Sequence, residues 1–222
     1  MAERSAQPPR WLLITFAVIA AAAVAFAIGR FTTFPAASDA SAPTTDSAEA
    51  GFARDMQVHH AQAIDMAMTI YRTTADEPIK ALAYDIATNQ SAQKGEFFDW
   101  LVRWNLPQAG GPLMAWMAGT DAHAAHGGTA PETATEAELM DQMGMATQAQ
   151  LDELAAAEGT EADCLFLELM IRHHEGALPM GQALLELGSD PRALNVADAV
   201  VSTQSAEIDL MRSMQARLSC TG

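Results

Sequence analysis

The sequence predicts an all-α protein, a four-helix bundle made of two repeated helical hairpins, with an N-terminal transmembrane helix in front of it. Three observations support this prediction. A histidine motif occurs twice with a constant offset of 114 residues, long segments carry apolar residues at helical spacing, and no segment has the pattern of a strand. Because the repeated unit is a supersecondary structure, the two copies indicate a bundle with a pseudo-twofold axis.

The N-terminus is predicted to be a membrane anchor. Residues 11–28 form an apolar run of 18 residues, preceded by Arg4 and Arg10 and closed by Gly29-Arg30. We expect residues 1–10 in the cytoplasm, a transmembrane segment over 11–30, and a flexible tether rich in Pro, Ser, Thr, Ala and Asp over 31–50. A cleaved signal segment, followed by secretion, is the alternative. Both place the domain on the extracytoplasmic side of the cell membrane.

The bundle domain is expected over residues 51–218. Asp76 and Asp190 each precede a proline-containing first turn and predict helix N-caps. Thr160-x-x-Asp163 resembles a capping box, and Gly188 predicts the end of that helix. The expected parts are repeat one (51–105), a crossover (106–160) and repeat two (161–218), with helices over 50–72, 76–104, 136–143, 148–157, 160–187 and 190–218 and a loop over 105–131.

The composition limits the classes of partner. The chain has 12 basic and 28 acidic side chains, so its surface repels phosphate backbones and nucleic acid is not an expected partner. The two cysteines, Cys164 and Cys220, lie at the start of one predicted helix and after the last one. If these helices are antiparallel neighbours, the two thiols meet, and a disulfide is preferred to metal binding.

Each histidine motif places methionine and histidine on one helix face, because residues three and four apart share a face. His60 and His174 point to the side of this stripe. Thioether sulfur combined with imidazole suits Cu(I), whereas iron and manganese prefer oxygen ligands, so a dinuclear iron oxidase is disfavoured. The stripes consist of Met56, His59, Ala63 and Met66 in the first copy and Met170, His173, Ala177 and Met180 in the second.

The crossover carries further soft ligands in a segment with little core to fill. These weaker metal candidates are Met114, Met117, His123, His126, Met140, Met143 and Met145.

A structural interpretation competes with the metal site. Methionine on a helix is an ordinary core residue, and a buried histidine is often only hydrogen-bonded. Gln90 and Gln204 are the expected hydrogen-bond partners in that case, since both follow their histidine pair at the same distance.

The doubled motif Phe-x-x-x-Met-x-x-His-His-x-x-Ala-x-x-Met, each copy followed by Gln-Ser-Ala, resembles the bacterial domain of unknown function 305 family over residues 52–214. The resemblance implies a ferritin-like four-helix fold in secreted or membrane-tethered proteins linked to copper binding and tolerance. Pro179 departs from the first copy and is expected to kink its helix. The ligands that the resemblance implies are Met56, His59, His60, Met66, Met170, His173, His174 and Met180.

No catalytic motif is evident, so a binding protein is favoured over an enzyme. Asp55 and Asp65 lie near the first histidines, but their repeat counterparts are Leu169 and Pro179, which leaves no symmetric acid–base pair. The favoured function is extracytoplasmic sequestration or transfer of Cu(I), with a copper acceptor as partner. The alternatives are a metal-free accessory module docked on a membrane complex, such as a respiratory one, and a redox enzyme with a dinuclear site.

Overall fold

The computed structural model describes residues 42–118, 120 and 134–220. Every regular element in these residues is helical, which confirms the predicted all-α class for this part of the chain. The elements in chain order are α2 (Ala48–Thr73), α3 (Glu77–Arg103), the 3₁₀ helix η1 (Ala115–Met117), α5 (Glu136–Gln142), α6 (Gln148–Ala156), α7 (Gly159–Leu187) and α8 (Pro191–Leu218).

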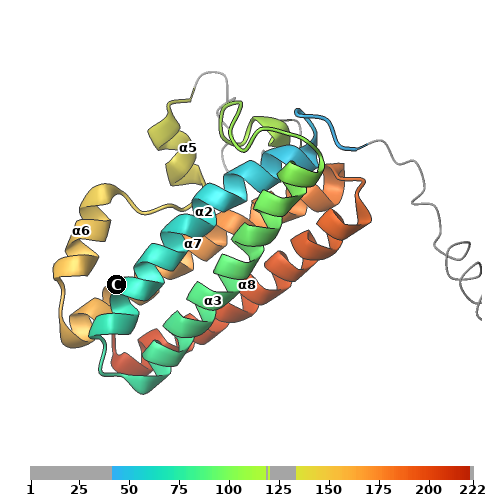
Figure 1. Ribbon diagram of the computed structural model, residues 1–222. Helices are drawn as coiled ribbons and strands as arrows, with labels where there is room; N and C mark the ends of the chain where they lie inside the picture. Colours follow the sequence, from blue (N-terminus) through green and yellow to red (C-terminus); the bar gives the residue numbers. More distant parts are fainter. Residues whose placement is uncertain (1–41, 119, 121–133, 221–222) are drawn as a thin grey trace, which may run out of the picture. The chain divides into compact units, whose positions relative to one another are not determined.

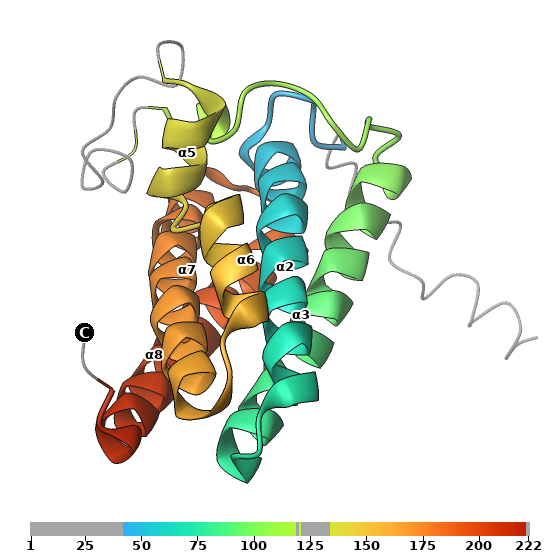
Figure 2. The same cartoon turned by 90° about the vertical axis from the view of Figure 1, so that its left-hand side faces the viewer.

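Four long helices form a helical bundle. α2 packs against α3, α7 packs against α8, and the two hairpins meet through α2 and α7. The short helices α5 and α6 lie over the α2–α7 side, whereas α3 and α8 form the opposite side (Figures 1 and 2). One side of the central α2–α7 pair is therefore covered by the crossover.

Two predicted features of the N-terminal part fall partly or wholly outside this description. The predicted transmembrane segment 11–30 and most of the tether lie outside the described residues. Among the helices that the structure describes, none has the length and apolar character needed to cross a membrane. α2 begins at Ala48, two residues before its predicted start, because the Ser47 hydroxyl accepts a hydrogen bond from the Ala50 amide and caps the helix.

The long-helix N-caps at Asp76 and Asp190 are present, and each carboxylate accepts backbone amide bonds of the following turn. The predicted capping box at Thr160 is wrong. α7 already begins at Gly159, so Thr160 lies within the first turn, and the N-cap Glu158 makes no side-chain capping bond. α7 continues through Pro179 as one helix to Leu187.

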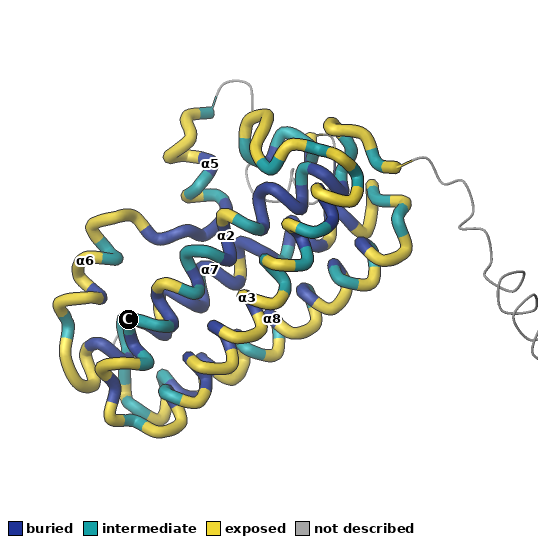
Figure 3. Tube along the Cα trace, in the orientation of Figure 1, coloured by how far each residue is buried: buried dark blue, intermediate teal, exposed yellow. Residues whose placement is uncertain are grey.

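The buried side chains form two apolar clusters, one toward each end of the bundle, while the outer faces of the helices are exposed (Figure 3). One cluster contains Met66 and Met170, and the other contains Met56 and Met180. Because α2 and α7 run in opposite directions, the N-terminal half of one shares a cluster with the C-terminal half of the other. The histidine pairs lie between the two clusters in sequence on both helices.

The crossover is fixed to both central helices just before α6. The Gln62 side chain of α2 donates to the Ala146 carbonyl and accepts from the Ala146 amide, at 2.9 and 2.7 Å. On α7, a Cβ atom built at Gly176 would lie 2.0 Å from the Met143 carbonyl oxygen. A Cβ atom built at Gly144 (φ +70°) would likewise overlap the Arg172 carbonyl oxygen. Only glycine permits these backbone-to-backbone contacts.

Replacing Gly176 by Ala is expected to destabilise the protein by about 1–3 kcal/mol, because the crossover backbone must move away from α7. Gly95→Ala is the matched control, since a Cβ at this α3 position meets nothing within 4 Å. Alanine there should stabilise the helix by about 0.5–1 kcal/mol. Urea unfolding of both variants checks this, and equal stability of the two would contradict the close contact.

A disulfide joins Cys164, near the start of α7, to Cys220, just after α8. Their Cα atoms lie 5.5 Å apart, and 56 residues separate them in sequence. Both cysteines are thereby removed from the potential metal ligands of the described residues.

Candidate metal centre

The first histidine of each motif lies at the contact between α2 and α7. The His59 and His173 rings stack with their centroids 3.6 Å apart and their planes 30° from parallel. Both side chains are completely buried. The small buried residues Ala63 and Ala177, one turn further along each helix, allow the two backbones to approach at this point.

The second histidine of each motif faces the other helix of its own hairpin. His60 Nε2 lies 2.8 Å from Gln93 Oε1 on α3, and His174 Nε2 lies 2.7 Å from Glu207 Oε2 on α8. All four rings are therefore buried but face different helices. The first histidine of each pair faces the α2–α7 contact, and the second faces the other helix of its hairpin.

The expected partners Gln90 and Gln204 were wrong. Neither amide bonds a histidine, and both amides are buried without a hydrogen-bond partner in the described part of the chain. They lie one turn before Gln93 and Glu207 on the same helices. The prediction therefore identified the correct helix face but the wrong residue on that face. The sequence did hold a signal, since each true partner follows its histidine by 33 residues in both repeats.

All four imidazoles use Nε2 to contact an oxygen acceptor. In addition to the two side-chain partners, His59 Nε2 lies 2.9 Å from the Met143 carbonyl oxygen, and His173 Nε2 lies 3.1 Å from the His59 carbonyl oxygen. A neutral imidazole carries one proton, and an oxygen acceptor fixes it on Nε2. The lone pair of every ring is therefore on Nδ1.

None of these four Nδ1 atoms has a hydrogen-bond partner among the described residues, and each is buried. A buried acceptor without a partner costs about 1–3 kcal/mol. The four rings therefore carry buried lone pairs that no donor in the described residues uses.

His59, His60 and His173 are neutral near physiological pH, because burial lowers the pKa of each ring. Burial lowers the pKa of His59 to about 3, assisted by the neighbouring charge of His60. Burial likewise lowers the pKa of His60 to about 4. Burial and the proximity of His59 hold the pKa of His173 well below its usual value. The Nδ1 lone pairs of these three rings are thus available without a prior loss of protons.

The motif methionines are buried on both sides of the histidine layer. Met56 of α2 belongs to the same apolar cluster as Met180 of α7, and Met66 belongs to the same cluster as Met170. The structure therefore groups the first methionine of one repeat with the last methionine of the other. This exchange between repeats follows from the antiparallel arrangement of α2 and α7.

The crossover methionines join one of these two clusters. The cluster of Met56 and Met180 also contains the buried Met114, Met117, Met143 and Met145, with the half-buried Met140 packed against it. The other weaker candidates, His123 and His126, lie outside the described residues.

The histidines do not form a site from classical hard or borderline ligands alone. Within the described residues, no group of three or more His, Cys, Asp or Glu side chains is placed to hold one metal ion. A site built on these histidines would therefore include donors of another kind, and the buried methionine sulfurs are candidates.

Asp55 has a structural task that the sequence did not reveal. It is buried, and its Oδ2 accepts hydrogen bonds from the Met114 amide and from Trp116 Nε1, both at 2.8 Å. Burial raises the pKa of Asp55 to about 6 despite these bonds. The carboxylate therefore anchors the crossover segment that carries Met114 to α2. Asp65, by contrast, is exposed.

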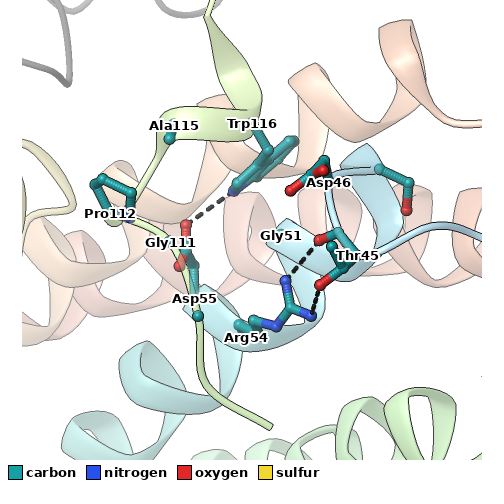
Figure 4. Close-up of a pocket in the computed structure, with 11 residues that line it drawn as sticks. Thr45, Asp46, Gly51, Arg54, Asp55, Gly111, Pro112, Ala115 and Trp116 are labelled. Carbon is teal, nitrogen blue, oxygen red and sulfur yellow. Dashed lines mark hydrogen bonds between the residues drawn. The ribbon is translucent and has the colours of Figure 1, made fainter. Parts of the chain in front are cut away.

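A pocket of about 370 Å³ lies next to Asp55 (Figure 4). Arg54 crosses it and donates to the backbone and side-chain oxygens of Thr45, while Trp116 points toward Asp55. No histidine or methionine lines this pocket, so it is separate from the histidine layer.

Comparison with known proteins gives consistent matches. The family model "Domain of unknown function (DUF305)" matches residues 49–215. A DUF305 protein of Streptomyces coelicolor, regarded as secreted, is 35% identical with a TM-score of 0.68, covering 79% of this chain and 95% of that chain. A DUF305 fragment from Deinococcus radiodurans is 30% identical with a TM-score of 0.62, covering 77% and 96%.

A third solved structure is similar to the chain over the same region. CopM in its Cu(II)-bound form is 26% identical with a TM-score of 0.55, covering 77% of this chain and 97% of that chain. A search of curated proteins gave no significant match.

Proposed function

The chain belongs to the DUF305 family, and on that premise we propose that it is an extracytoplasmic protein that binds copper, as Cu(I), for sequestration or transfer. One observation carries the proposal. Four buried histidines each hold Nε2–H on an oxygen acceptor and leave Nδ1 without a partner among the described residues.

This arrangement is what a metal-ligating imidazole requires. Such a ring binds the ion through one nitrogen while the other N–H is held by a carboxylate or carbonyl, which fixes the tautomer and the ring orientation. An ion at Nδ1 would also remove the cost of leaving four buried acceptors unsatisfied. A purely structural histidine has no need of a free Nδ1.

The donor set favours Cu(I) over harder metals. The motif buries its methionine sulfurs on the same helices as the histidines, and thioether with imidazole suits Cu(I). The similarity to CopM, solved with Cu(II), supports copper as the metal. The ligands in this proposal are Met56, His59, His60, Met66, Met170, His173, His174 and Met180. The weaker candidates of the crossover are Met114, Met117, His123, His126, Met140, Met143 and Met145, of which Met114, Met117, Met143 and Met145 are buried.

The test is a Cu(I) titration of the full chain against a chromogenic chelator under reducing conditions. His59→Gln combined with His173→Gln keeps an N–H donor at the end of each side chain and removes both Nδ1 lone pairs. We expect this variant to lose roughly 100-fold or more in Cu(I) affinity, which corresponds to about 2.8 kcal/mol.

Sulfur is tested separately by Met56→Leu with Met170→Leu, because leucine keeps nearly the same volume. Affinity for Cu(I) should fall roughly tenfold or more, consistent with the loss of a soft ligand. Met211→Leu is the matched control, since Met211 is equally buried but lies on α8 outside the motif. Unchanged Cu(I) binding in both the histidine and the methionine variants would contradict the proposed ligands, whereas a wild-type chain that binds no Cu(I) would favour the metal-free accessory module.

The N-terminal segment extends the proposal to location. We infer that residues 11–30 anchor a ferritin-like bundle on the extracytoplasmic side of the membrane, with secretion after cleavage as the alternative. The similarity to a DUF305 protein regarded as secreted supports this side of the membrane. Fractionation of cells that express the full chain, followed by protease treatment of intact cells, distinguishes an anchored domain from a released one.

A further inference from the structure

The two halves of the histidine layer differ in charge, although the repeat makes them alike in geometry. Gln93 and Glu207 are related by the same offset of 114 residues as the histidines that they contact. In the first repeat, the partner of the buried ring is a neutral amide, and in the second it is a carboxylate. The two hydrogen bonds have nearly equal lengths of 2.8 and 2.7 Å.

The neighbouring residue increases this difference. Lys94 follows Gln93 on α3 and places a positive charge beside the partner of His60. The position equivalent to Lys94 in the second repeat is the apolar Ile208. A positive charge therefore acts on the first half of the layer, and a negative charge acts on the second.

The carboxylate is partly shielded from water. The side chain of Glu207 is 14% exposed, and the ring of His174 that it contacts is completely buried. Charges interact more strongly in such surroundings than at an open surface. A carboxylate on the far nitrogen also raises the basicity of a ligating imidazole.

We propose that Glu207 is a positioning residue that makes the His174 half of the centre the tighter and first-filled site for a monovalent soft cation. This inference rests on the proposed metal-binding function and adds an order of filling to it. Glu207 touches the ring and not the ion, and it acts by holding Nε2–H and by placing a negative charge behind the ligand. The first repeat, with Gln93 and Lys94, is the weaker half.

The repeat supplies its own matched variants. Glu207→Gln gives the second half the partner that the first half already has, and Gln93→Glu does the reverse. Both changes are nearly isosteric, so the hydrogen bond to the ring keeps its geometry. Glu186→Gln, at an exposed position on α7, removes one negative charge elsewhere and controls for the overall charge of the chain.

The experiment titrates the full chain with Ag(I), a redox-inert soft cation, and follows the histidine rings by NMR with isotope-labelled histidine. In the wild type, the His174 ring signals should shift at lower Ag(I) than those of His60. Glu207→Gln should lower the affinity for the first ion roughly 10- to 100-fold, as expected when the group that holds the far nitrogen of a ligating histidine is changed, and remove this order. Gln93→Glu should strengthen Ag(I) binding and make the His60 ring signals shift at a lower Ag(I) concentration.

The outcomes separate the two proposals. Wild-type chain that binds no Ag(I) would remove the proposed function itself, and this inference with it. Binding with equal filling of both halves, or with effects of the same sign in the two exchange variants, would overturn the role of Glu207 alone. If Glu207→Gln fails to fold by circular dichroism, the opposite expectation for Gln93→Glu still decides the question. A change in Glu186→Gln equal to that in Glu207→Gln also overturns the specific role.

Discussion

Reduction of the Cys164–Cys220 disulfide is expected to lower the free energy of unfolding by about 4 kcal/mol. The bond closes a loop of 56 residues that contains most of α7 and all of α8. Opening the loop raises the entropy of the unfolded chain and thereby lowers the free energy of unfolding by about 4 kcal/mol. The hairpin that carries His173 and His174 depends on this tie at its open end. Urea unfolding of the full chain with and without a phosphine reductant measures the effect.

The control for this experiment lies at the same end of the bundle. Arg217 of α8 donates two hydrogen bonds to the Asp76 carboxylate at the start of α3, and this exposed pair also links the helix ends. Exposed ion pairs contribute little, so Arg217→Gln should destabilise the protein far less than reduction does. A Cys164→Ser, Cys220→Ser variant should match the reduced wild type. Loss of less than about 1 kcal/mol in both would show that the helix packing alone holds the hairpin.

Much of the fold followed from local signals in the sequence. Asp76 and Asp190 correctly predicted two helix starts, because a short carboxylate before a proline-containing first turn is typical of a helix N-cap. The repeat offset indicated that His59 and His173 are equivalent, and the structure places their rings in contact. The start of α7 was predicted at the wrong residue, Thr160, because neighbouring residues compete to be the first that leaves the helical conformation.

The parts of the site that the sequence did not reveal are those made by tertiary contact. The backbone carbonyl of Met143 accepts a hydrogen bond from His59, and a pattern of side chains does not predict a backbone acceptor. The grouping of Met56 with Met180 required the direction of α7 relative to α2, which hydrophobic periodicity does not contain. Glu207 was not predicted for another reason. The repeat is defined by positions that are identical in both copies, and Glu207 differs from its counterpart Gln93.

Between pH 7 and pH 5, the metal-free protein is expected to lose about 3 kcal/mol or more of unfolding free energy. The folded pKa values of His59 and His60, about 3 and about 4, lie below the unfolded value of 6.5. For a depressed pKa, the stabilisation is complete above pH 6.5 and is lost as the pH falls toward the folded value. At pH 5, each ring then costs about 2 kcal/mol, because the unfolded chain binds protons that the folded chain excludes.

Two other groups set the size of this effect. His173, whose pKa is also well below its usual value, acts in the same direction as the first two rings. Asp55 opposes them, because its folded pKa of about 6 lies above the unfolded value, and its protonation below pH 6 recovers about 1 kcal/mol at pH 5. Asp55→Asn should therefore steepen the loss of stability, whereas His60→Gln should reduce it by about 2 kcal/mol.

Urea unfolding at pH 7, 6 and 5 measures this pH dependence, with chelator present to keep the protein free of metal. A difference below about 1 kcal/mol between pH 7 and pH 5 would mean that protons reach the buried rings in the folded state. The expected result has a functional consequence. Rings that resist protonation to pH 5 keep their Nδ1 lone pairs free, so Cu(I) competes with few protons in the folded protein across this range. Affinity of the folded protein for Cu(I) should then change little between pH 7 and pH 5, unlike that of exposed histidines, whose pKa near 6.5 lies within this interval.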